Sequence, residues 1–283
     1  MPDTPVSTIS IENMGSCAMQ NLVFRYVSLW SQTETWGGDI PPMEGESVAI
    51  PAGQHLLVDV DSTPELNAII VEGSMIFDSD VDPNHFRTFD ANFIMVHHGY
   101  FELGTEEFPY TSKIQITMHA TRFSPSFGIY GNKMIGCRYC QLSMHGIPKT
   151  TTWTKLSATA DVGATTIQVQ GEPDWNVGDH IVIAGTTWHF NYDHEERYIE
   201  SISGSTITLT EPLLHKHISE APSFGGVEIE MRAEVGLLTR NVVYRGNPAD
   251  SKKDLFGAHI IVHSPGDESS IARIHYIEIT EAG

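Results

Sequence analysis

The sequence of 283 residues has no long apolar run, few basic residues and only three cysteines. No stretch reaches the roughly 20 apolar residues that a membrane-spanning helix needs, so we expect no such helix. The first residues lack the basic and apolar regions of a secretion signal, and no Asn-x-Ser/Thr glycosylation acceptor occurs. Apolar residues rarely recur at a helical spacing, so a largely helical fold is not expected.

Basic side chains are scarce relative to acidic ones. The chain carries 16 lysines and arginines against 36 aspartates and glutamates, for a formal net charge of −20. A surface this acidic repels the phosphates of nucleic acid, so a nucleic-acid partner is excluded. From Gly226 onward six basic residues face nine acidic ones, so an anionic partner is expected to prefer this C-terminal part.

Short runs of valine, isoleucine, phenylalanine and threonine alternate with glycine, proline, asparagine and aspartate, which predicts an all-β protein. Five strand anchors, at Val48, Ile69, Phe93, Ile114 and Met134, are separated by 21, 24, 21 and 20 residues. A period of this length without helices predicts the rungs of a parallel β-solenoid over residues 40–148. The residues expected in its interior are Ile70, Met75, Phe77, Ile94, Val96, Ile116 and Met118.

A second pattern begins near Thr150, where strands lie close together and are joined by short turns. Such spacing favours a small antiparallel β-barrel or sandwich inserted in the solenoid, over Thr150 to about Leu214. The long period returns from Val227 and stops at Gly283 in what reads as mid-solenoid, so we expect a fragment of a longer parent chain. The predicted parts are a lead-in at 1–30, a solenoid at 31–149, an insert at 150–225 and continuing rungs at 226–283.

The cysteines are Cys17, Cys137 and Cys140. The "CRYC" motif has no second cysteine pair and no histidines at ligand spacing, so zinc is not expected, and it lacks the context of a thioredoxin motif. Ordinary cysteines in the solenoid wall are the favoured interpretation. A local disulfide and a redox role are the alternatives.

The segment 36–146 contains "PMEGESVAIPAG" from Pro42 to Gly53, then "IIVEGSMIF", "HHGYFELGTEEFPY" and "GNKMIGCRYCQLSMHG". These strings resemble the G-eight domain, which is named for eight glycines and found in fibrocystin-type proteins and in the cell-migration-inducing and transmembrane hyaluronidases. The similarity continues through "MRAEVGLLTRNVVYRG" and "FGAHIIV". The candidates for the eight glycines are Gly45, Gly53, Gly73, Gly99, Gly104, Gly131, Gly136 and Gly146.

This resemblance implies an extracellular or cell-surface protein, a right-handed parallel β-helix and a role in ligand binding, with hyaluronan degradation in some members. Two features depart from the family pattern. The "CRYC" cysteines stand where relatives usually have small or acidic residues, and the histidine-rich "RYPIHFH"-like rung of the hyaluronidase branch is missing. The second departure argues against degradative activity in this chain.

The segment "TTWHFNYDHEE", residues 186–196, concentrates ligand-capable side chains. It is interpreted first as a solvated hairpin tip, and then as a ligand-binding loop with Trp188 and Tyr192 or as a metal site. The metal hypothesis, for Ca²⁺ or another divalent cation, joins carboxylates and imidazoles that suit such ions. Its foremost candidate ligands are Asp193, His194, Glu196, His215 and His217, and Glu195 and His189 are expected to be able to approach the same cation.

In "MRAEVGLLTRN", Arg232, Glu234 and Arg240 are interpreted as a clamp between insert and solenoid, with an anion-binding groove formed by the two arginines as the alternative. His145 is interpreted as structural, bound to a solenoid corner. No pair of acids can be chosen as glycosidase residues from sequence, and GxSxG and nucleotide motifs are absent.

Three functions follow: an extracellular module that binds a glycan or protein ligand, a hyaluronidase-like enzyme, and a structural block that self-assembles. Exposed aromatics such as Trp188, Tyr192 and Tyr100 would suit sugar stacking in the first. The acidic surface disfavours chemistry on an anionic polymer without a metal. We therefore predict a binding or structural role, and expect that this chain alone does not cut hyaluronan.

Overall fold

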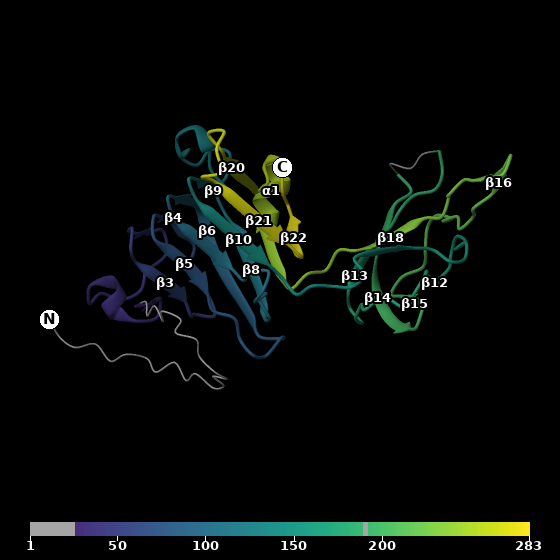
Figure 1. Cartoon of the computed structure of the whole chain (residues 1–283), viewed down its shortest axis with the longest axis horizontal. Coiled ribbons are helices and arrows are strands. Elements are labelled where there is room, and N and C mark those ends of the chain that lie inside the picture. The colour runs from purple at the N-terminus through teal and green to yellow at the C-terminus, as the bar shows by residue number, and fades with distance from the viewer. Residues whose placement is uncertain (1–25, 189–191) are drawn as a thin grey trace, which may run out of the picture.

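A computed structural model describes residues 26–188 and 192–283. Figure 1 shows two bodies side by side, a stack of parallel strands and a smaller antiparallel body, connected by two extended segments. The only α-helix in the described residues is α1 (Pro248–Asp254), and two short 3₁₀ helices, η1 (Thr33–Trp36) and η2 (Gly128–Tyr130), accompany it. The predicted all-β class is confirmed. No helix of the described part is long and apolar enough to cross a bilayer.

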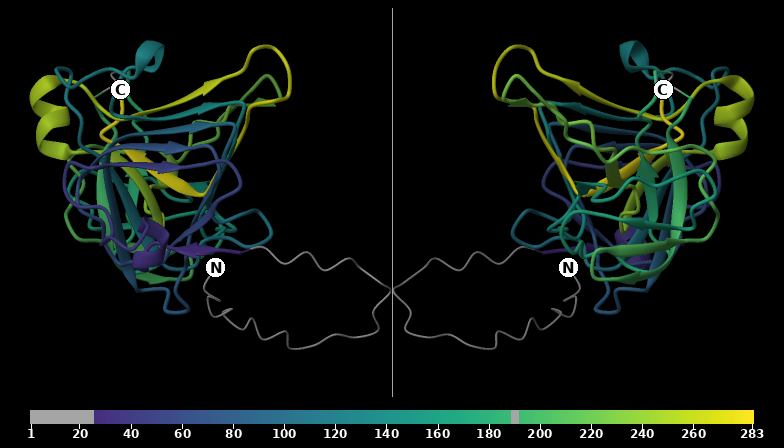
Figure 2. Two further views of the ribbon diagram at one scale, coloured as in Figure 1. Left: turned by 90° about the vertical axis from the view of Figure 1, so that its left-hand side faces the viewer. Right: turned by 90° about the vertical axis from the view of Figure 1, so that its right-hand side faces the viewer.

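The stack consists of two parallel sheets, and each turn of the chain adds a strand to both. In sheet A every strand pairs in parallel with its neighbour, and Leu56, Met75, Phe101 and Leu142 form one row across it. Figure 2 shows the successive turns lying side by side. In spatial order, sheet A contains β1 (Ser28–Leu29), β3 (His55–Val58), β5 (Ser74–Phe77), β7 (Tyr100–Leu103), β10 (Gln141–His145) and β21 (Ile271–His275).

Sheet B faces sheet A and is also parallel. Ile50, Val71, Val96 and Cys137 form one of its inward rows. Its strands are β2 (Ser47–Ile50), β4 (Leu66–Val71), β6 (Phe86–His97), β8 (Lys113–Met118), β9 (Met134–Arg138), β19 (Val242–Gly246), β20 (His259–His263) and β22 (Ile277–Thr280).

Sheet B contains a seam. The long strand β6 pairs with β8 along its first half and with β9 along its second half, so β8 and β9 belong to one turn. The next turn is divided in the same way, since β19 pairs with β8 and β20 with β9. The two segments that leave the sheet here, 119–133 and 247–258, touch through Asn247 Nδ2 and His119 Nδ1 at 3.2 Å and through Lys133 Nζ and Ser251 Oγ at 2.9 Å.

The core lies between the two sheets, where inward side chains alternate with outward ones. Six of the seven residues expected in the interior are buried there: Met75, Phe77, Ile94, Val96, Ile116 and Met118. The prediction is wrong for Ile70. Ile69 points inward instead, and Ile70 lies half-buried on the outer face of sheet B, where it packs against Met95 and Met134.

Several glycines allow turns of the stack to approach closely. A Cβ added to Gly99 would lie 2.3 Å from the carbonyl oxygen of Val71 and 2.8 Å from that of Gly73, which leaves no room for a side chain. At Gly136 the nearest atoms are the sulfurs of Met95 and Met134, whose flexible side chains can move.

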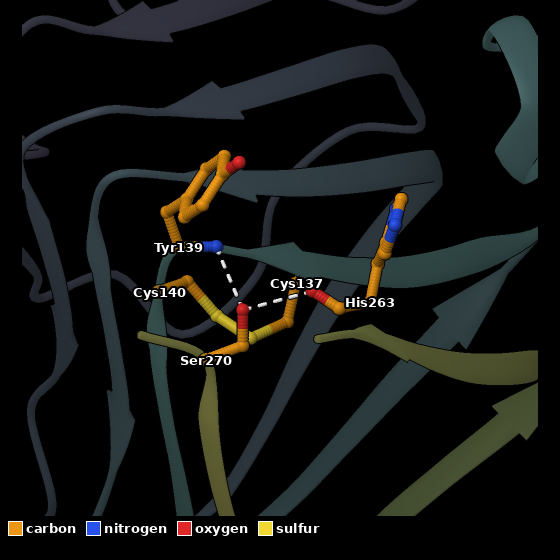
Figure 3. The surroundings of a disulfide bond; sticks show 5 residues. All are labelled: Cys137, Tyr139, Cys140, His263 and Ser270. Carbon is orange, nitrogen blue, oxygen red and sulfur yellow. Dashed lines mark hydrogen bonds between the residues drawn. A yellow bond between two sulfur atoms is a disulfide. The ribbon is translucent and has the colours of Figure 1, made fainter. Parts of the chain in front are cut away.

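Cys137 and Cys140 form a disulfide between β9 and β10, so the favoured interpretation of ordinary wall cysteines is corrected to its local-disulfide alternative. Both residues are buried, so the bond lies inside the wall of the stack. Figure 3 shows the bond beside Ser270, whose hydroxyl accepts from Tyr139 N at 2.8 Å and donates to His263 O at 2.9 Å. Cys17 lies outside the described residues.

The second body is a six-stranded antiparallel sheet. Its edges are brought together by the bridge between Leu156 and Val169, so the sheet closes into a small barrel around Trp175, Ile181 and Ile207. In order, its strands are β11 (Trp153–Lys155), β18 (Glu234–Leu237), β13 (His180–Ile183), β14 (Glu195–Ser203), β15 (Thr206–Leu209) and β12 (Thr166–Gln168). The antiparallel pairing includes β18, beyond the limit at residue 225 expected from the sequence. A hairpin of β16 (Ser223–Phe224) and β17 (Val227–Glu228) extends from it (Figure 1).

Asn241 holds the junction between the two bodies. Its side-chain amide donates to the carbonyl oxygens of Tyr110 at 2.7 Å and Ser112 at 2.8 Å, and its oxygen accepts from Ile147 N at 2.8 Å. One short side chain thereby ties the entry and exit segments of the barrel to the stack.

Candidate functional site

The first candidate is the segment predicted to bind a ligand or a metal. Trp188 and Tyr192 are 92% and 79% exposed, so both aromatic rings are available to solvent. His189 lies outside the described residues. From Tyr192 onward the chain alternates, with Asp193 buried and His194 and Glu196 exposed. The predicted metal ligands are therefore distributed over two faces of the chain.

Contacts divide these predicted ligands further. The closest approach between Asp193 and His215 is 3.8 Å, from Oδ1 to Nδ1, whereas Glu196 Oε2 contacts His180 Nε2 at 3.1 Å. Within the described residues, no group of three or more His, Cys, Asp or Glu side chains has the geometry to hold a metal ion. The metal site stays a prediction, and the fold brings its expected ligands together only in pairs, Asp193 with His215 and Glu195 with His217.

The residue at the centre of this region is Glu195, one of the carboxylates expected to approach a cation. Its Oε1 accepts from His215 N at 2.7 Å, and its Oε2 accepts from Leu214 N at 2.8 Å and from the Arg197 guanidinium. Arg197 also donates to the Pro212 carbonyl at 2.8 Å. Burial opposes ionisation of Glu195, but the hydrogen bonds from Leu214 and His215, then those of His217 and Arg197, hold its pKa below the usual range.

His217 completes this network and is fully buried. Its Nδ1 lies 2.8 Å from Ala184 O and its Nε2 lies 3.1 Å from Glu195 Oε1. Both partners are acceptors, so the imidazole ring is held between them as a hydrogen-bond donor. The cluster of Glu195, Arg197 and His217 is thus a buried ionic clamp that fixes the segment 212–217 against β14.

The two arginines predicted to bind an anion lie at opposite ends of β18. Arg232 pairs with Glu230 at 2.8 Å rather than with Glu234. Burial lowers the pKa of Arg240, while the carboxylates of Asp179 in the barrel and Glu278 in the stack act in the opposite direction. Arg240 therefore lies at the junction of the two bodies, where the predicted clamp would place it, and it is separated from Arg232.

A second candidate, which sequence reasoning did not find, is a groove on the outer face of sheet A. This sheet-A groove has a volume of about 620 Å³ and runs across β7, β10 and β21 beside the loop 104–108. It is lined by Tyr100, Glu102, Thr105, Glu106, Glu107, Phe108, Gln141, Leu142, Ser143, His145 and Arg273.

The floor of the groove follows from strand register. Glu102 on β7 lies beside Ser143 on β10, which lies beside Arg273 on β21. Neighbouring strands are about 4.8 Å apart, so the acid and the arginine start about 9.6 Å from each other with a small serine between them. Arg273 makes no ion pair in the described part of the chain. The acceptor Glu102 and the donor Arg273 thus lie on opposite sides of Ser143 in the groove floor.

Hydrogen bonds fix the other polar groups of the floor. The Tyr100 hydroxyl donates to Glu102 Oε2, and Ser143 Oγ lies 2.9 Å from Gly104 O and 3.1 Å from His145 Nδ1. Burial, then the hydrogen bond and charge of Glu102, raise the pKa of Tyr100 well above its usual range, so it stays a donor.

His145 is 3% exposed, and its Nε2 has no hydrogen-bond partner. Its ring stacks on His275 with centroids 5.0 Å apart. Burial is the main cause that lowers the pKa of His145, so the ring is neutral near pH 7. The predicted structural role is consistent with the Nδ1 contact, but an unpartnered buried nitrogen costs about 1–3 kcal/mol and indicates a polar site that a ligand can complete.

The rim of the groove is acidic and partly apolar. Glu106 and Glu107 are exposed on the loop 104–108, and Phe108 beside them is 72% exposed. The signal in the sequence was the outward set of alternate residues on β7 and β10, namely tyrosine and glutamate followed by glutamine, serine and histidine.

Comparison with known proteins shows which proteins this chain is similar to. Residues 35–157 match the model of the G8 domain. The chain is 34% identical to fibrocystin-L of Mus musculus and 33% identical to fibrocystin-L of Homo sapiens, with 97% of this chain aligned in both cases. It is also 30% identical to protein rliB of Dictyostelium discoideum over 86% of its length.

The chain spans only a small part of these relatives. The alignments cover 7% of each fibrocystin-L and 21% of protein rliB. The closely packed glycines Gly73, Gly99, Gly104, Gly136 and Gly146, which the sequence suggested as members of the set of eight, lie within the matched residues 35–157. The chain therefore carries a G8 domain and belongs with the G8-domain proteins.

Proposed function

We propose that this chain is an extracellular ligand-binding module and that it binds carbohydrate in the sheet-A groove. The observation that carries the proposal is the row of Glu102, Ser143 and Arg273 on three neighbouring strands, in a groove whose floor includes the unpartnered nitrogen of His145. Each hydroxyl of a sugar both donates and accepts, so it can bridge a carboxylate and a guanidinium that do not pair with each other.

The rest of the groove suits the same class of ligand. Sugar rings present C–H groups on one face, and the exposed ring of Phe108 at the rim offers an apolar surface for that face. The volume of about 620 Å³ lies within the range of small-molecule sites and is large enough for one or two sugar rings. A rigid parallel sheet holds the polar groups in place, which lowers the entropic cost of binding.

The location and the architecture around the site are part of this proposal. The Cys137–Cys140 disulfide favours an oxidising compartment, in line with extracellular placement. We further propose that the stacked sheets form a right-handed β-helix within a longer parent protein, with the divisions at residues 30 and 149 expected from the sequence and with the barrel extended past residue 225 to include β18. An extracellular protein ligand and self-assembly are the alternative roles of this module.

Cleavage of hyaluronan is not part of the proposal. Glycosidases use two carboxyl groups on either side of the bond that breaks. In the groove Glu102 already accepts the Tyr100 hydroxyl, and Arg273 faces it across Ser143. Incubation of the chain with high-molecular-weight hyaluronan, with and without Ca²⁺, should leave its size distribution unchanged.

Binding to an array of neutral and acidic oligosaccharides, followed by calorimetry, tests the proposed function. Arg273→Ala should weaken the best ligand by about tenfold or more, because a hydrogen bond from a charged donor contributes about 1.5–3 kcal/mol. Arg122→Ala, at an exposed arginine outside the groove, is the matched control. No saccharide binding at all, or equal affinities of the two variants, would refute the function.

A further inference from the structure

Building on this proposed function, we infer that the sheet-A groove selects neutral saccharides with two adjacent free hydroxyl groups and rejects saccharides that contain uronic acid. The inference names the chemical class of the ligand. It depends on the distribution of charge around the groove and on the spacing of its donors and acceptors.

The groove carries more negative than positive charge. Three carboxylates, those of Glu102, Glu106 and Glu107, line it, whereas Arg273 is the only arginine or lysine among the lining residues. The uncharged His145 adds no positive charge. A uronate in the groove would approach more carboxylates than guanidinium groups, and the net charge of −20 on the whole chain adds to the repulsion.

The spacing of the polar groups favours a hydroxyl pair over a carboxylate. Arg273 lies beside the Ser143 hydroxyl in the row, with Glu102 on the far side, so a ligand that bridges the row has to satisfy Glu102 as well as the guanidinium, and a carboxylate cannot donate to Glu102. Glu102 can only accept, and Arg273 can only donate. Two adjacent hydroxyls satisfy both groups, since one donates to Glu102 while the other accepts from Arg273.

A divalent cation could in principle bridge an acidic sugar to these carboxylates. Nothing in the described residues supports such a bridge, because no group of three potential ligands with metal geometry is found there. The Tyr100 hydroxyl also occupies one oxygen of Glu102, which reduces what this carboxylate can offer to an ion.

The test is calorimetric titration of the full chain with four tetrasaccharides of equal length: cellotetraose, mannotetraose, chitotetraose and a hyaluronan tetrasaccharide. At least one neutral tetrasaccharide should bind about tenfold more tightly than the hyaluronan fragment, with or without added Ca²⁺. The double variant Glu106→Gln, Glu107→Gln should narrow the ratio of the two affinities, because removal of two carboxylates from the rim improves the affinity for the hyaluronan fragment. Both residues are exposed, so the fold should tolerate the change.

The outcomes separate the inference from the function on which it rests. Equal or tighter binding of the hyaluronan fragment, or binding that requires Ca²⁺, would overturn the selectivity but leave carbohydrate binding standing. If the ratio of neutral-sugar to hyaluronan affinity is unchanged in the double variant, Glu106 and Glu107 do not cause the selectivity, and the inference is refuted. Failure of all four sugars and of the array would remove the proposed function itself.

Discussion

Replacement of Glu195 by glutamine should destabilise the barrel strongly, although it changes only one atom of the side chain. The carboxylate accepts from two backbone amides, from Arg197 and from His217. The glutamine oxygen can accept the hydrogen bonds of one carboxylate oxygen. The NH₂ group would stand where the other oxygen was, and because it is itself a donor it cannot accept from the two donors that point at that position. The positive charge of Arg197 would lose its buried counter-ion.

The magnitude follows from burial. Glu195 is 5% exposed, Arg197 9% and His217 0%, so water cannot replace the lost contacts. Removal of one partner from such a buried ionic pair costs about 3–5 kcal/mol. The neighbouring Glu196→Gln change is the control, since its carboxylate is exposed and pairs with His180 alone among the residues that the structure describes. That substitution should cost about 0–1 kcal/mol.

Hydrogen exchange shows where in the barrel the substitution acts. The amides of Leu214 and His215 donate to Glu195, so these two amides should exchange much faster in Glu195→Gln and remain protected in Glu196→Gln. Urea unfolding then supplies the free energy. Equal destabilisation by the two substitutions, or unchanged protection of both amides in Glu195→Gln, would refute the clamp.

The lowered pKa of Glu195 also determines how the stability of the barrel changes with pH. The folded pKa of Glu195 lies below that of an unfolded glutamate, which is about 4.3, so its stabilisation is complete above that pH. The contribution is lost as pH falls through the folded pKa. The stability difference between wild type and Glu195→Gln should therefore be largest near neutral pH and shrink under acid conditions.

Three further substitutions test the stack and the junction. Gly99→Ala should cost several kcal/mol because its Cβ would meet backbone oxygen, whereas Gly136→Ala meets flexible methionine sulfurs and should cost less; comparable urea midpoints would contradict this. Asn241→Ala removes three hydrogen bonds at the junction and should cost about 2–4 kcal/mol, with faster exchange of the Ile147 amide as the local readout. Cys137→Ser opens a very short loop and should lower stability by about 2 kcal/mol, an effect that reduction of the wild type should reproduce.

The period of the strand anchors predicted the parallel stack, because each turn has to bury one apolar row on the next. The period could not show which residue of each strand lies beside which residue of the next strand. Val48 does lie beside Ile69, but Ile69 lies beside Ile94 rather than Phe93. Ile70 was placed inside for the same reason, since a run of consecutive apolar residues gives no sign of which side chain faces inward.

The candidate sites were harder to predict. The buried alternation of Asp193, Glu195 and Arg197 was visible as a pattern, but the fold brings in the segment 212–217, and only the fold shows that this segment hydrogen-bonds to Glu195 and Arg197. The sheet-A groove joins residues from positions 100 to 273, and no local motif connects side chains so far apart. Register between distant turns is the information that one sequence lacks.

The seam in sheet B has a consequence for what can be added to this protein. Segments 119–133 and 247–258 leave the sheet between two strand halves that remain aligned, so the stack already tolerates extra chain at this position in two consecutive turns. The helix α1 is itself such an addition. A fluorescent reporter or an affinity tag inserted near the exposed Phe123 would enter at a place where strand register does not depend on loop length.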